Sequence, residues 1–382
     1  MHNILYVSHT SQVAGAEHSL RLLLERLAPR FRPTIALPGT GPLTDLLDEM
    51  GVPYCPAPMV RLKRTRNPAR LFRYFRAWRR ALHTVGELIG ELGIDLVHAN
   101  STTAHLFSSP AARRAGVPSV WHVRDMSSPG GRLDRMMTRD AAAVVCISEA
   151  VRSRLVHPEL AAAKTTVIYN GVDTAAFAPG DGAPVRSELG LDPSAPVAGI
   201  VGQVVPWKGH DRFLAAAADA AARVQEAQFI VAGDNRFGDF PGILDRLRRQ
   251  ADRLGIGDRV HFLGWRDDPA AVMNALDVLV TASEDEPFGR VVVEAMACGK
   301  PVVGFRCGGP VEIIEHDRTG LLVEPYDVDA MADAVTGLLS DRGRAAAMGQ
   351  AGRERACRDF SADAHVARIH ALYDRLLARD AG

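Results

Sequence analysis

Two carboxylates and a helix start make Ser283 to Pro301 the stretch of this sequence best suited to chemistry. Glu286 precedes a helix predicted over roughly 289–297, and Glu294 lies about one and a half turns inside it. The first backbone N–H groups of a helix lack intrahelical partners and stabilise an anion such as phosphate. An ionised carboxylate accepts hydrogen bonds from neighbouring hydroxyls. The stretch therefore predicts a site for a ligand that carries both phosphate and sugar.

The same stretch has a plainer interpretation, an ordinary strand–loop–helix unit with a capping acid. Two glutamates separated by seven residues are by themselves a weak signal. The full combination is more specific: Glu286-Pro-Phe-Gly289, then a branched apolar run, Glu294-Ala-Met-Ala297 and Gly299-Lys-Pro301. This combination resembles the signature of the retaining, GT-B-fold glycosyltransferases of family four.

The resemblance implies an α/β protein of the GT-B fold, with two Rossmann-like, doubly wound domains facing an interdomain cleft. It implies transfer of a sugar from a nucleoside diphosphate sugar, by family habit a UDP-sugar, to an acceptor hydroxyl with retention of anomeric configuration. The acceptor would be a glycan or a lipid-linked group in polysaccharide, glycolipid or glycoconjugate synthesis. Neither a cofactor nor a metal is expected.

Length and composition agree with such an enzyme. The chain has 382 residues, which suits two domains of ordinary size. Lys+Arg and Asp+Glu are balanced at 45 each, so bulk charge predicts no nucleic-acid partner. The five cysteines form no CxxC pair, and no stretch resembles a signal peptide or a transmembrane span. We therefore expect a cytoplasmic protein, at most peripheral at the inner membrane face.

Apolar runs alternate with helical patterns along the chain, which predicts parallel sheets covered by helices on both faces. The predicted strands of the first half lie at 3–7, 34–37, 95–98, 119–123 and 143–147. From this alternation we predict two domains, at 1–172 and 196–360. The resemblance implies that the N-terminal domain is the acceptor side and the second domain the donor side. The Pro/Gly-rich segment 173–195 is predicted to be the linker between them. The resemblance also implies that a C-terminal helix at 361–382 packs back on the first domain.

Two features of the first half belong to the expected cleft. The loop Val13-Ala-Gly-Ala-Glu17 resembles the family's Gly-Gly-Ala-Glu loop, except that Ala14 replaces the first glycine. Gly15 keeps the close backbone approach to the donor. His122 ends a predicted strand, and the resemblance implies that it faces the donor sugar as a catalytic residue; the alternative is a strand-end histidine bonded to backbone.

Lys208 is the residue of the second half whose positive charge could take part in the chemistry. A point charge beside a diphosphate stabilises it as the sugar–phosphate bond breaks, whereas the alternative is a solvated loop lysine. The chain has Gln203 where the family usually has arginine, so catalysis would be weaker or Arg290 or Arg124 would substitute. The resemblance assigns Lys208 and Glu286 to catalysis. It assigns the rest of the donor site to Gly15, Gln203, Trp265, Arg266, Phe288, Gly289, Arg290 and Glu294, with the ribose diol on Glu294.

The segment 61–80 concentrates nine basic residues and no acidic one. A helix here would carry an apolar stripe and a separate basic face. The basic face would consist of Arg66, Arg70, Arg73 and Arg80. Such a helix suits an anionic membrane or a phosphate-bearing lipid acceptor, and equally a core helix with solvated arginines.

Rival functions stay open. A nucleotide-sugar epimerase shares the architecture, a glycogen-phosphorylase-like enzyme would need pyridoxal phosphate, and a non-catalytic sugar-nucleotide-binding partner subunit fits the substitutions Ala14 and Gln203. Asp327-Val-Asp329 resembles the metal-binding Asp-x-Asp of other transferases, but a predicted helix at 330–339 follows it directly. Capping explains that pair better than a metal.

Overall fold

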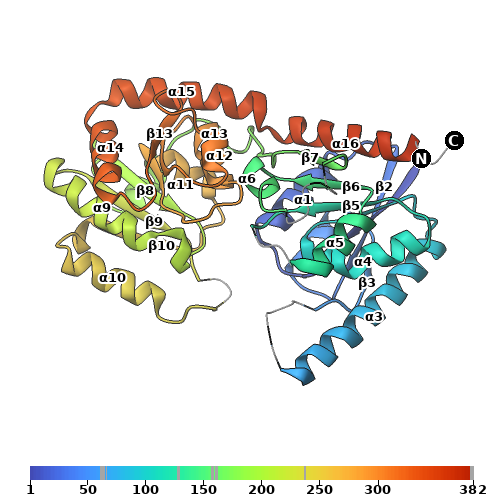
Figure 1. The fold of residues 1–382 in the computed structure, drawn as a ribbon. Coiled ribbons are helices and arrows are strands. Elements are labelled where there is room, and N and C mark those ends of the chain that lie inside the picture. The colour runs from blue at the N-terminus through green and yellow to red at the C-terminus, as the bar shows by residue number, and fades with distance from the viewer. Residues whose placement is uncertain are drawn as a thin grey trace. The chain divides into compact units, whose positions relative to one another are not determined.

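The computed structural model describes residues 1–60, 65, 67–126, 130–155, 159, 162–235 and 238–378. Arg66, assigned above to the basic face, lies outside the described residues. The chain forms two compact units (Figure 1). The first unit contains Met1–Gly171 and Ala362–Gly382, and the second contains Val172–Ser361.

A parallel seven-stranded sheet forms the centre of the first unit, in the order β3-β2-β1-β4-β5-β6-β7. Its strands are β1 (His2–Val7), β2 (Phe31–Leu37), β3 (Tyr54–Pro56), β4 (Leu96–Ala99), β5 (Ser119–Val123), β6 (Ala143–Cys146) and β7 (Thr165–Val167). The strand order reverses between β1 and β4, which makes the sheet doubly wound. The sequence did not predict β3, because a three-residue edge strand carries no periodicity.

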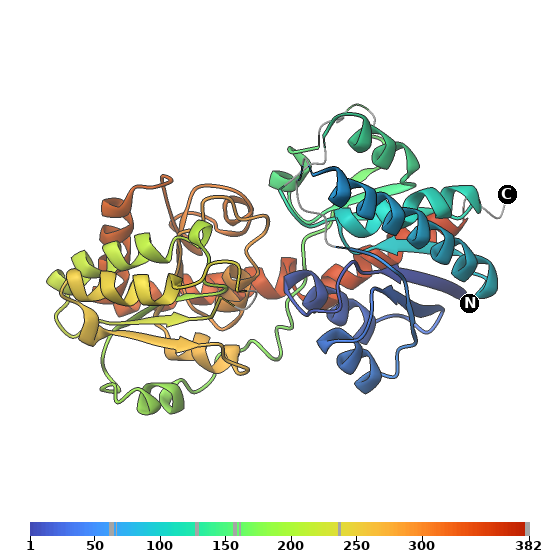
Figure 2. The same ribbon diagram turned by 90° about the horizontal axis from the view of Figure 1, so that it is seen from below.

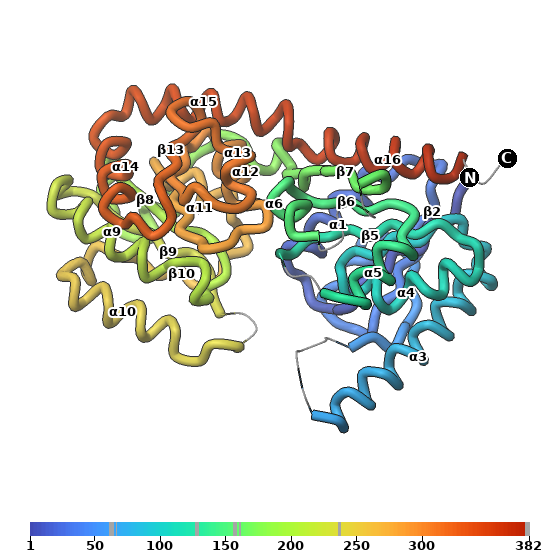
Figure 3. Tube along the Cα trace, in the orientation of Figure 1, coloured from blue at the N-terminus to red at the C-terminus, as the bar shows by residue number. Residues whose placement is uncertain are grey.

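Helices cover both faces of this sheet. They are α1 (Gly15–Glu25), α2 (Pro42–Glu49), α3 (Pro68–Glu91), α4 (Thr102–Arg114), α5 (Gly131–Asp140), α6 (Glu149–Arg152) and α16 (Ala362–Ala378). Alternate residues of β1 point to opposite faces: Ile4 and Tyr6 pack with α1, α2 and α16, whereas Leu5 and Val7 pack with α3 and α4. Thus α16, the last helix of the chain, completes the core of the first unit (Figure 3).

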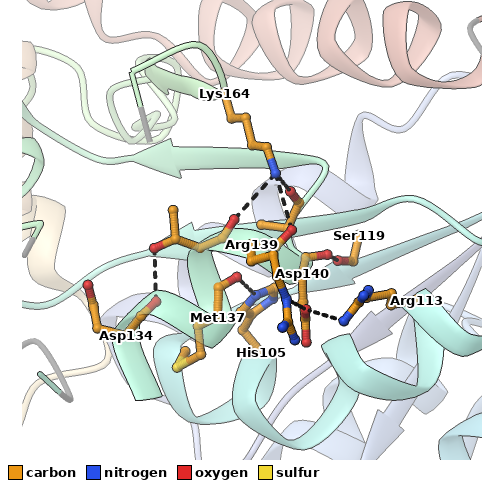
Figure 4. A network of polar contacts seen from close by, with 10 residues as sticks. His105, Arg113, Ser119, Asp134, Met137, Arg139, Asp140 and Lys164 are labelled. Atoms are coloured by element: carbon orange, nitrogen blue, oxygen red, sulfur yellow. Dashed lines mark hydrogen bonds and ion pairs between the residues drawn. The ribbon is translucent and has the colours of Figure 1, made fainter. Parts of the chain in front are cut away.

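The end of α5 is fixed by a local polar network (Figure 4). Lys164 donates to the carbonyls of Arg139 and Ala141, at 3.2 and 2.9 Å. Arg113 and the Arg139 side chain both donate to Asp140 Oδ1. Cations at a helix C-terminus satisfy its unpaired carbonyls, so this network fixes the entry into β6.

The second unit repeats the doubly wound plan with six parallel strands in the order β10-β9-β8-β11-β12-β13. The strands are β8 (Val197–Val201), β9 (Gln228–Ala232), β10 (Val260–Gly264), β11 (Val278–Thr281), β12 (Val302–Phe305) and β13 (Gly320–Val323). The two parallel sheets confirm the predicted α/β, Rossmann-like fold class.

The helices of the second unit also lie on both faces of its sheet. They are α8 (Ala183–Glu188), η1 (Pro206–Lys208), α9 (His210–Arg223), α10 (Ile243–Arg253), η2 (Gly257–Arg259), α11 (Pro269–Ala275), α12 (Arg290–Ala297), α13 (Pro310–Ile313), α14 (Val328–Ser340) and α15 (Arg342–Asp359). In Figure 2, α9 and α10 lie side by side, and both share a core with α14. On the other face α12 packs against α11 and α15.

The segment 173–195 is not a free linker, which corrects the domain prediction. It belongs to the second unit and contains the short helix α8. Arg186 anchors it by donating to the Ala275 carbonyl at 3.0 Å and by pairing with Asp277 at 2.9 Å. Its Pro/Gly-rich composition suggested a linker, but the fork of donors on one arginine holds it to the unit.

Buried neutral histidines make the fold acid-sensitive. Burial lowers the pKa of His210 from its ordinary 6.5 to about 4. Neither ring nitrogen of His210 has a hydrogen-bond partner among the residues that the structure describes. Between pH 6.5 and 4 the unfolded chain therefore binds a proton that the folded chain excludes. The free energy of unfolding accordingly decreases as the pH is lowered through this range.

The free energy of unfolding of the wild-type protein should decrease between pH 7 and pH 5. We expect this decrease to be smaller in His210→Leu by about 2 kcal/mol. Urea denaturation of both proteins at each pH measures this. Above pH 7 the two proteins should show the same slope of stability against pH. An unchanged loss on acidification in His210→Leu would contradict the prediction.

Candidate active site

The structure brings two of the predicted catalytic residues into direct contact. Lys208 ends the short helix η1 after β8, and Glu286 lies in the loop between β11 and α12. The Lys208 ammonium donates to Glu286 Oε2, and the Ser283 hydroxyl donates to the same oxygen at 3.2 Å. The Lys208 side chain is 27% exposed and that of Glu286 is 10% exposed. The pair is thus largely desolvated, yet its cation can be reached from solvent.

Hydrogen bonds to backbone carbonyls hold together the two loops that carry this pair. The Glu284 N–H donates to the Trp207 carbonyl at 2.9 Å, and Arg212 Nη1 donates to the Ala282 carbonyl at 3.1 Å. Gly209 is left-handed, with φ 72°, and a Cβ there would lie 2.1 Å from the Ala282 oxygen. Only glycine allows this approach, so Gly209 sets the position of Lys208.

Replacing Gly209 by alanine should therefore cost stability through overlap as well as backbone strain. Gly190 provides a matched control, because its φ is 67° and no described atom lies within 4 Å of where its Cβ would be. We expect Gly190→Ala to cost about 1 kcal/mol from strain alone, and Gly209→Ala about 2 kcal/mol more. Equal losses in urea denaturation would show that the overlap is relieved without cost.

The signature helix α12 begins directly after Gly289, whose φ is 99°. The loop before it is held by the segment after β12, because the Gly309 N–H donates to the Glu286 carbonyl at 2.8 Å. A Cβ on Gly308 would lie 2.3 Å from that same oxygen. The Cys307-Gly-Gly-Pro310 segment thus shapes the approach to the helix start, where anions are stabilised.

The other predicted donor residues of the second unit are placed differently. Arg290 Nη2 pairs with Glu294 Oε1 at 2.7 Å, so these two predicted ligands satisfy each other. The Phe288 side chain is buried and packs edge-on against Phe360, which leaves only its backbone for a ligand. Gln203 is half-buried in the loop after β8.

The loop after β10 carries Trp265 and Arg266, which the resemblance assigned to the donor site. Trp265 is half exposed, and its indole N–H donates to Asp267 at 2.8 Å. Arg266 pairs with Asp268 and Glu188, both at 2.7 Å, and these bonds raise the pKa of Arg266. The Arg266 guanidinium therefore holds the loop in place. The strand β10 that precedes this loop is at the edge of the sheet, separated from β8 by β9.

In the first unit His122 is fully buried at the carboxyl end of β5. Its Nδ1 lies 3.0 Å from His98 Nε2 and 3.2 Å from Arg124 Nη2. Arg124 also donates to Asn170 Oδ1 at 2.7 Å and to Asn100 Oδ1 at 2.9 Å. Burial, then the Arg124 charge, lowers the pKa of His122 well below its ordinary value. His122 is thus a neutral ring bonded to side chains.

Gly15 is the first residue of α1, and no described atom lies within 4 Å of where its Cβ would be. Packing within the described residues therefore does not require glycine here. Ala14 is the N-cap of the helix, and its N–H donates to the buried Glu17 carboxylate at 3.2 Å. Burial raises the pKa of Glu17. The loop is preserved as a helix entry despite the alanine.

Residues 68–80 of the basic segment lie in the first half of α3, where Arg70, Arg73 and Arg80 are exposed. The predicted apolar stripe consists of Leu71, Phe75, Trp78 and Leu82, and these side chains fall into two groups. Trp78 and Leu82 pack on the unit, and the Trp78 indole donates to the Leu106 carbonyl at 2.9 Å. Leu71 and Phe75 are half exposed. Among the described helices none is long and apolar enough to cross a bilayer.

Sequence reasoning missed Ser283 and Tyr373, which contact Glu286 and His98 respectively. A serine next to a strand end and a tyrosine in an apolar helical stripe have no distinguishing signal. The capping interpretation of Asp327 is confirmed, since its carboxylate accepts from the Ala330 N–H at 2.9 Å.

A cavity of about 770 Å³ lies elsewhere in the second unit, beside Pro196 and Pro301 at the amino ends of β8 and β12. Arg186, Lys300 and Arg342 line it, and each already donates to a backbone carbonyl. Ligands of doubly wound sheets gather at the opposite, carboxyl ends. The carboxyl ends of the strands, where Lys208 and Glu286 lie, are therefore the better candidate for the active site.

Comparison with protein families matches both halves of the chain. Residues 184–355 match the family "Glycosyl transferases group 1", and residues 13–176 match "Glycosyltransferase Family 4". A D-inositol 3-phosphate glycosyltransferase of Mycobacterium sp. (strain KMS) is 40% identical over 176 residues, which cover 46% of this chain and 39% of that protein. A second such enzyme, from Catenulispora acidiphila, is 38% identical over 56% of this chain and 51% of its own length. The chain thus spans about half or less of these relatives.

Solved structures match over nearly the whole chain. Anabaena Alr3699/HepE, crystallised with UDP and glucose, is 27% identical with a TM-score of 0.83, covering 98% of this chain and 100% of that one. A glycosyltransferase from Rickettsia africae ESF-5 has a TM-score of 0.85 at 21% identity, over 98% of each chain, and supports the fold alone.

Proposed function

This chain belongs to the GT-B glycosyltransferases of family four, and we propose on that premise that it transfers a sugar from a nucleoside diphosphate donor to an acceptor hydroxyl. The observation that carries the proposal is the contact between Lys208 and Glu286 beside the start of α12. A cation, a helix N-terminus and a carboxylate in one place suit a diphosphate joined to a sugar. UDP is the proposed carrier, since the Anabaena neighbour was crystallised with UDP-glucose.

In this proposal Lys208 and the start of α12 stabilise the diphosphate as the sugar leaves, and Glu286 and His122 hold the sugar. Glu294 holds the ribose. The leaving phosphate takes the proton of the acceptor on the same face, which retains the anomeric configuration without a protein nucleophile. No metal takes part, so EDTA should leave turnover unchanged.

A panel of UDP-, GDP- and ADP-sugars tests the donor by thermal shift, followed by acceptor screening. Inositol phosphate is the first acceptor to try, because the matched relatives are named for it. NMR of the product gives its anomeric configuration. Conversion of the donor without acceptor would instead support an epimerase, and binding without transfer across the panel would support a partner subunit. An absorbing pyridoxal group would indicate the phosphorylase-like alternative.

We further propose that the first half of α3 docks on an anionic membrane. Arg70, Arg73, Arg76, Arg79 and Arg80 are exposed there beside the half-exposed or exposed Leu71, Phe72 and Phe75. No acidic residue occurs between Pro68 and Thr84. Each cation near an anionic surface contributes about 1 kcal/mol, and exposed aromatic rings enter the interface. This basic-aromatic surface matches a lipid-linked acceptor.

Co-sedimentation with phosphatidylglycerol-containing vesicles tests this second proposal. The double variant Phe72→Ser/Phe75→Ser and the single variant Arg73→Glu should each weaken binding, and salt should weaken it as well. Vesicles of phosphatidylcholine alone are the control. Binding that is equal on neutral and anionic vesicles would contradict electrostatic docking.

A further inference from the structure

A row of buried polar side chains crosses the first unit from α16 to the end of β5. Tyr6, His98 and His122 come from the neighbouring strands β1, β4 and β5, and Tyr373 comes from α16. Tyr6 is directly paired with His98 in the sheet. All four side chains are fully buried. Uncharged polar groups at such depth must be matched donor to acceptor, so their proton positions can be worked out.

The contacts form one continuous chain. The Tyr6 and Tyr373 hydroxyls lie 3.2 Å apart, and the Tyr373 hydroxyl lies 2.5 Å from His98 Nδ1. His98 Nε2 lies 3.0 Å from His122 Nδ1. Arg124 Nη2 approaches that same Nδ1 at 3.2 Å. The only buried ring nitrogen of the row without a hydrogen-bond partner among the described residues is His122 Nε2.

Arg124 decides the direction of the chain. A guanidinium only donates, so His122 Nδ1 must be an acceptor. His98 Nε2 faces the same lone pair and must therefore carry a proton. A neutral His98 protonated on Nε2 has a lone pair on Nδ1, which requires Tyr373 to donate its hydroxyl proton there. In the opposite order His122 Nδ1 would carry a proton and donate it to His98 Nε2. The N–H of Arg124 would then point at the N–H of His122, which is two donors against each other.

We propose that His98, Tyr373 and Arg124 are positioning residues that lock His122 in the tautomer protonated on Nε2. His122 then carries a fixed, buried N–H donor on Nε2 at the end of β5, and its lone pair is engaged on Nδ1. The partner of that donor is an oxygen of the ligand, which rests on the proposed function in that the oxygen would be a hydroxyl of the donor sugar. Locked in this form, His122 binds and orients but does not accept a proton.

Neighbouring groups agree with this assignment. His365, whose ring stacks on His122 with centroids 6.2 Å apart, donates its Nδ1 proton to the Tyr169 carbonyl at 2.7 Å. It therefore does not compete for His122 Nδ1. Burial lowers the pKa of His98 and His122 well below the ordinary value, so both rings are neutral near pH 7.

Nitrogen NMR of the intact, histidine-labelled protein tests the proposal without a substrate, because protonated and unprotonated ring nitrogens have separate chemical shifts. The signals of His98 and His122 are assigned by their loss in His98→Gln and His122→Gln. The expected wild-type result is a single tautomer for both rings, protonated on Nε2. His122 protonated on Nδ1, or a mixture of its tautomers, would overturn the proposal.

Two matched variants separate positioning from plain packing. Tyr373→Phe and Tyr6→Phe each remove one buried hydroxyl, and both remove the contact between the two tyrosines. Only Tyr373→Phe removes the donor to His98. Tyr6→Phe should keep the wild-type pattern, whereas Tyr373→Phe should bring the two His98 nitrogen shifts toward each other and move that of His122 Nδ1.

Identical nitrogen shifts in the two variants would overturn the role of Tyr373. If a variant does not fold, the wild-type spectrum still decides the tautomer. Absence of sugar transfer would sink the proposed function and leave these shifts unaffected, so the two failures are distinguishable.

Discussion

Replacing Lys208 by alanine is expected to lower kcat for sugar transfer by about 10²–10³-fold, which corresponds to about 3–4 kcal/mol. Lys208 is the cation that the structure places against Glu286 and beside the start of α12. The charge on the diphosphate grows as the sugar–phosphate bond breaks, so a fixed cation stabilises the transition state more than the ground state. The loss should therefore appear in kcat more than in KM.

Initial rates with a saturating nucleotide sugar measure this prediction. Lys208→Arg keeps the charge but not the compact head group, and we expect it to recover part of the rate. Arg249→Ala is the control for loss of a positive charge, since Arg249 is exposed on α10. If Lys208→Ala and Arg249→Ala turned over alike, Lys208 would have no part in the chemistry.

Much of the fold was predictable because it depends on local patterns. The runs at Asn3 and Ser119 form β1 and β5, because short branched apolar segments between turn residues suit buried parallel strands. The start of α12 after Gly289 was predictable for a similar reason, since glycine marks where the backbone turns left-handed. These signals need no knowledge of partners far along the chain.

Side-chain partners far apart in the sequence were not predictable. His98 and Tyr373 are 275 residues apart, and only the packing of α16 on the first sheet brings them together. Composition also misled at 173–195, where one arginine anchors a Pro/Gly-rich segment. Arg290 and Glu294 were each assigned to the donor, yet at a spacing of four residues on a helix they pair with each other.

Replacing Glu286 by glutamine is expected to lower kcat/KM by about a hundredfold or more. Both the Lys208 ammonium and the Ser283 hydroxyl donate to Glu286 Oε2, so this oxygen must be an acceptor. Glutamine keeps the size of the side chain, but its amide nitrogen is a donor and its carbonyl is uncharged. The variant leaves Lys208 without its counter-charge and leaves the sugar hydroxyls without an anionic acceptor.

Glu284→Gln is the matched control, two residues away on the same loop. Glu284 pairs with Arg212, and its side chain is 39% exposed, so losing its charge should change turnover only slightly. Equal losses in Glu284→Gln and Glu286→Gln would mean that the loop merely tolerates no change of charge. That result would remove Glu286 from the proposed sugar site.

The double variant Lys208→Ala/Glu286→Gln shows whether the two residues act as one unit. If Lys208 must be held by Glu286 to meet the diphosphate, then losing either residue already removes most of the benefit. The double variant should in that case be about as slow as Lys208→Ala alone. Two independent losses would instead multiply, giving a further loss of about a hundredfold, and the contact between the two side chains would then be incidental to transfer.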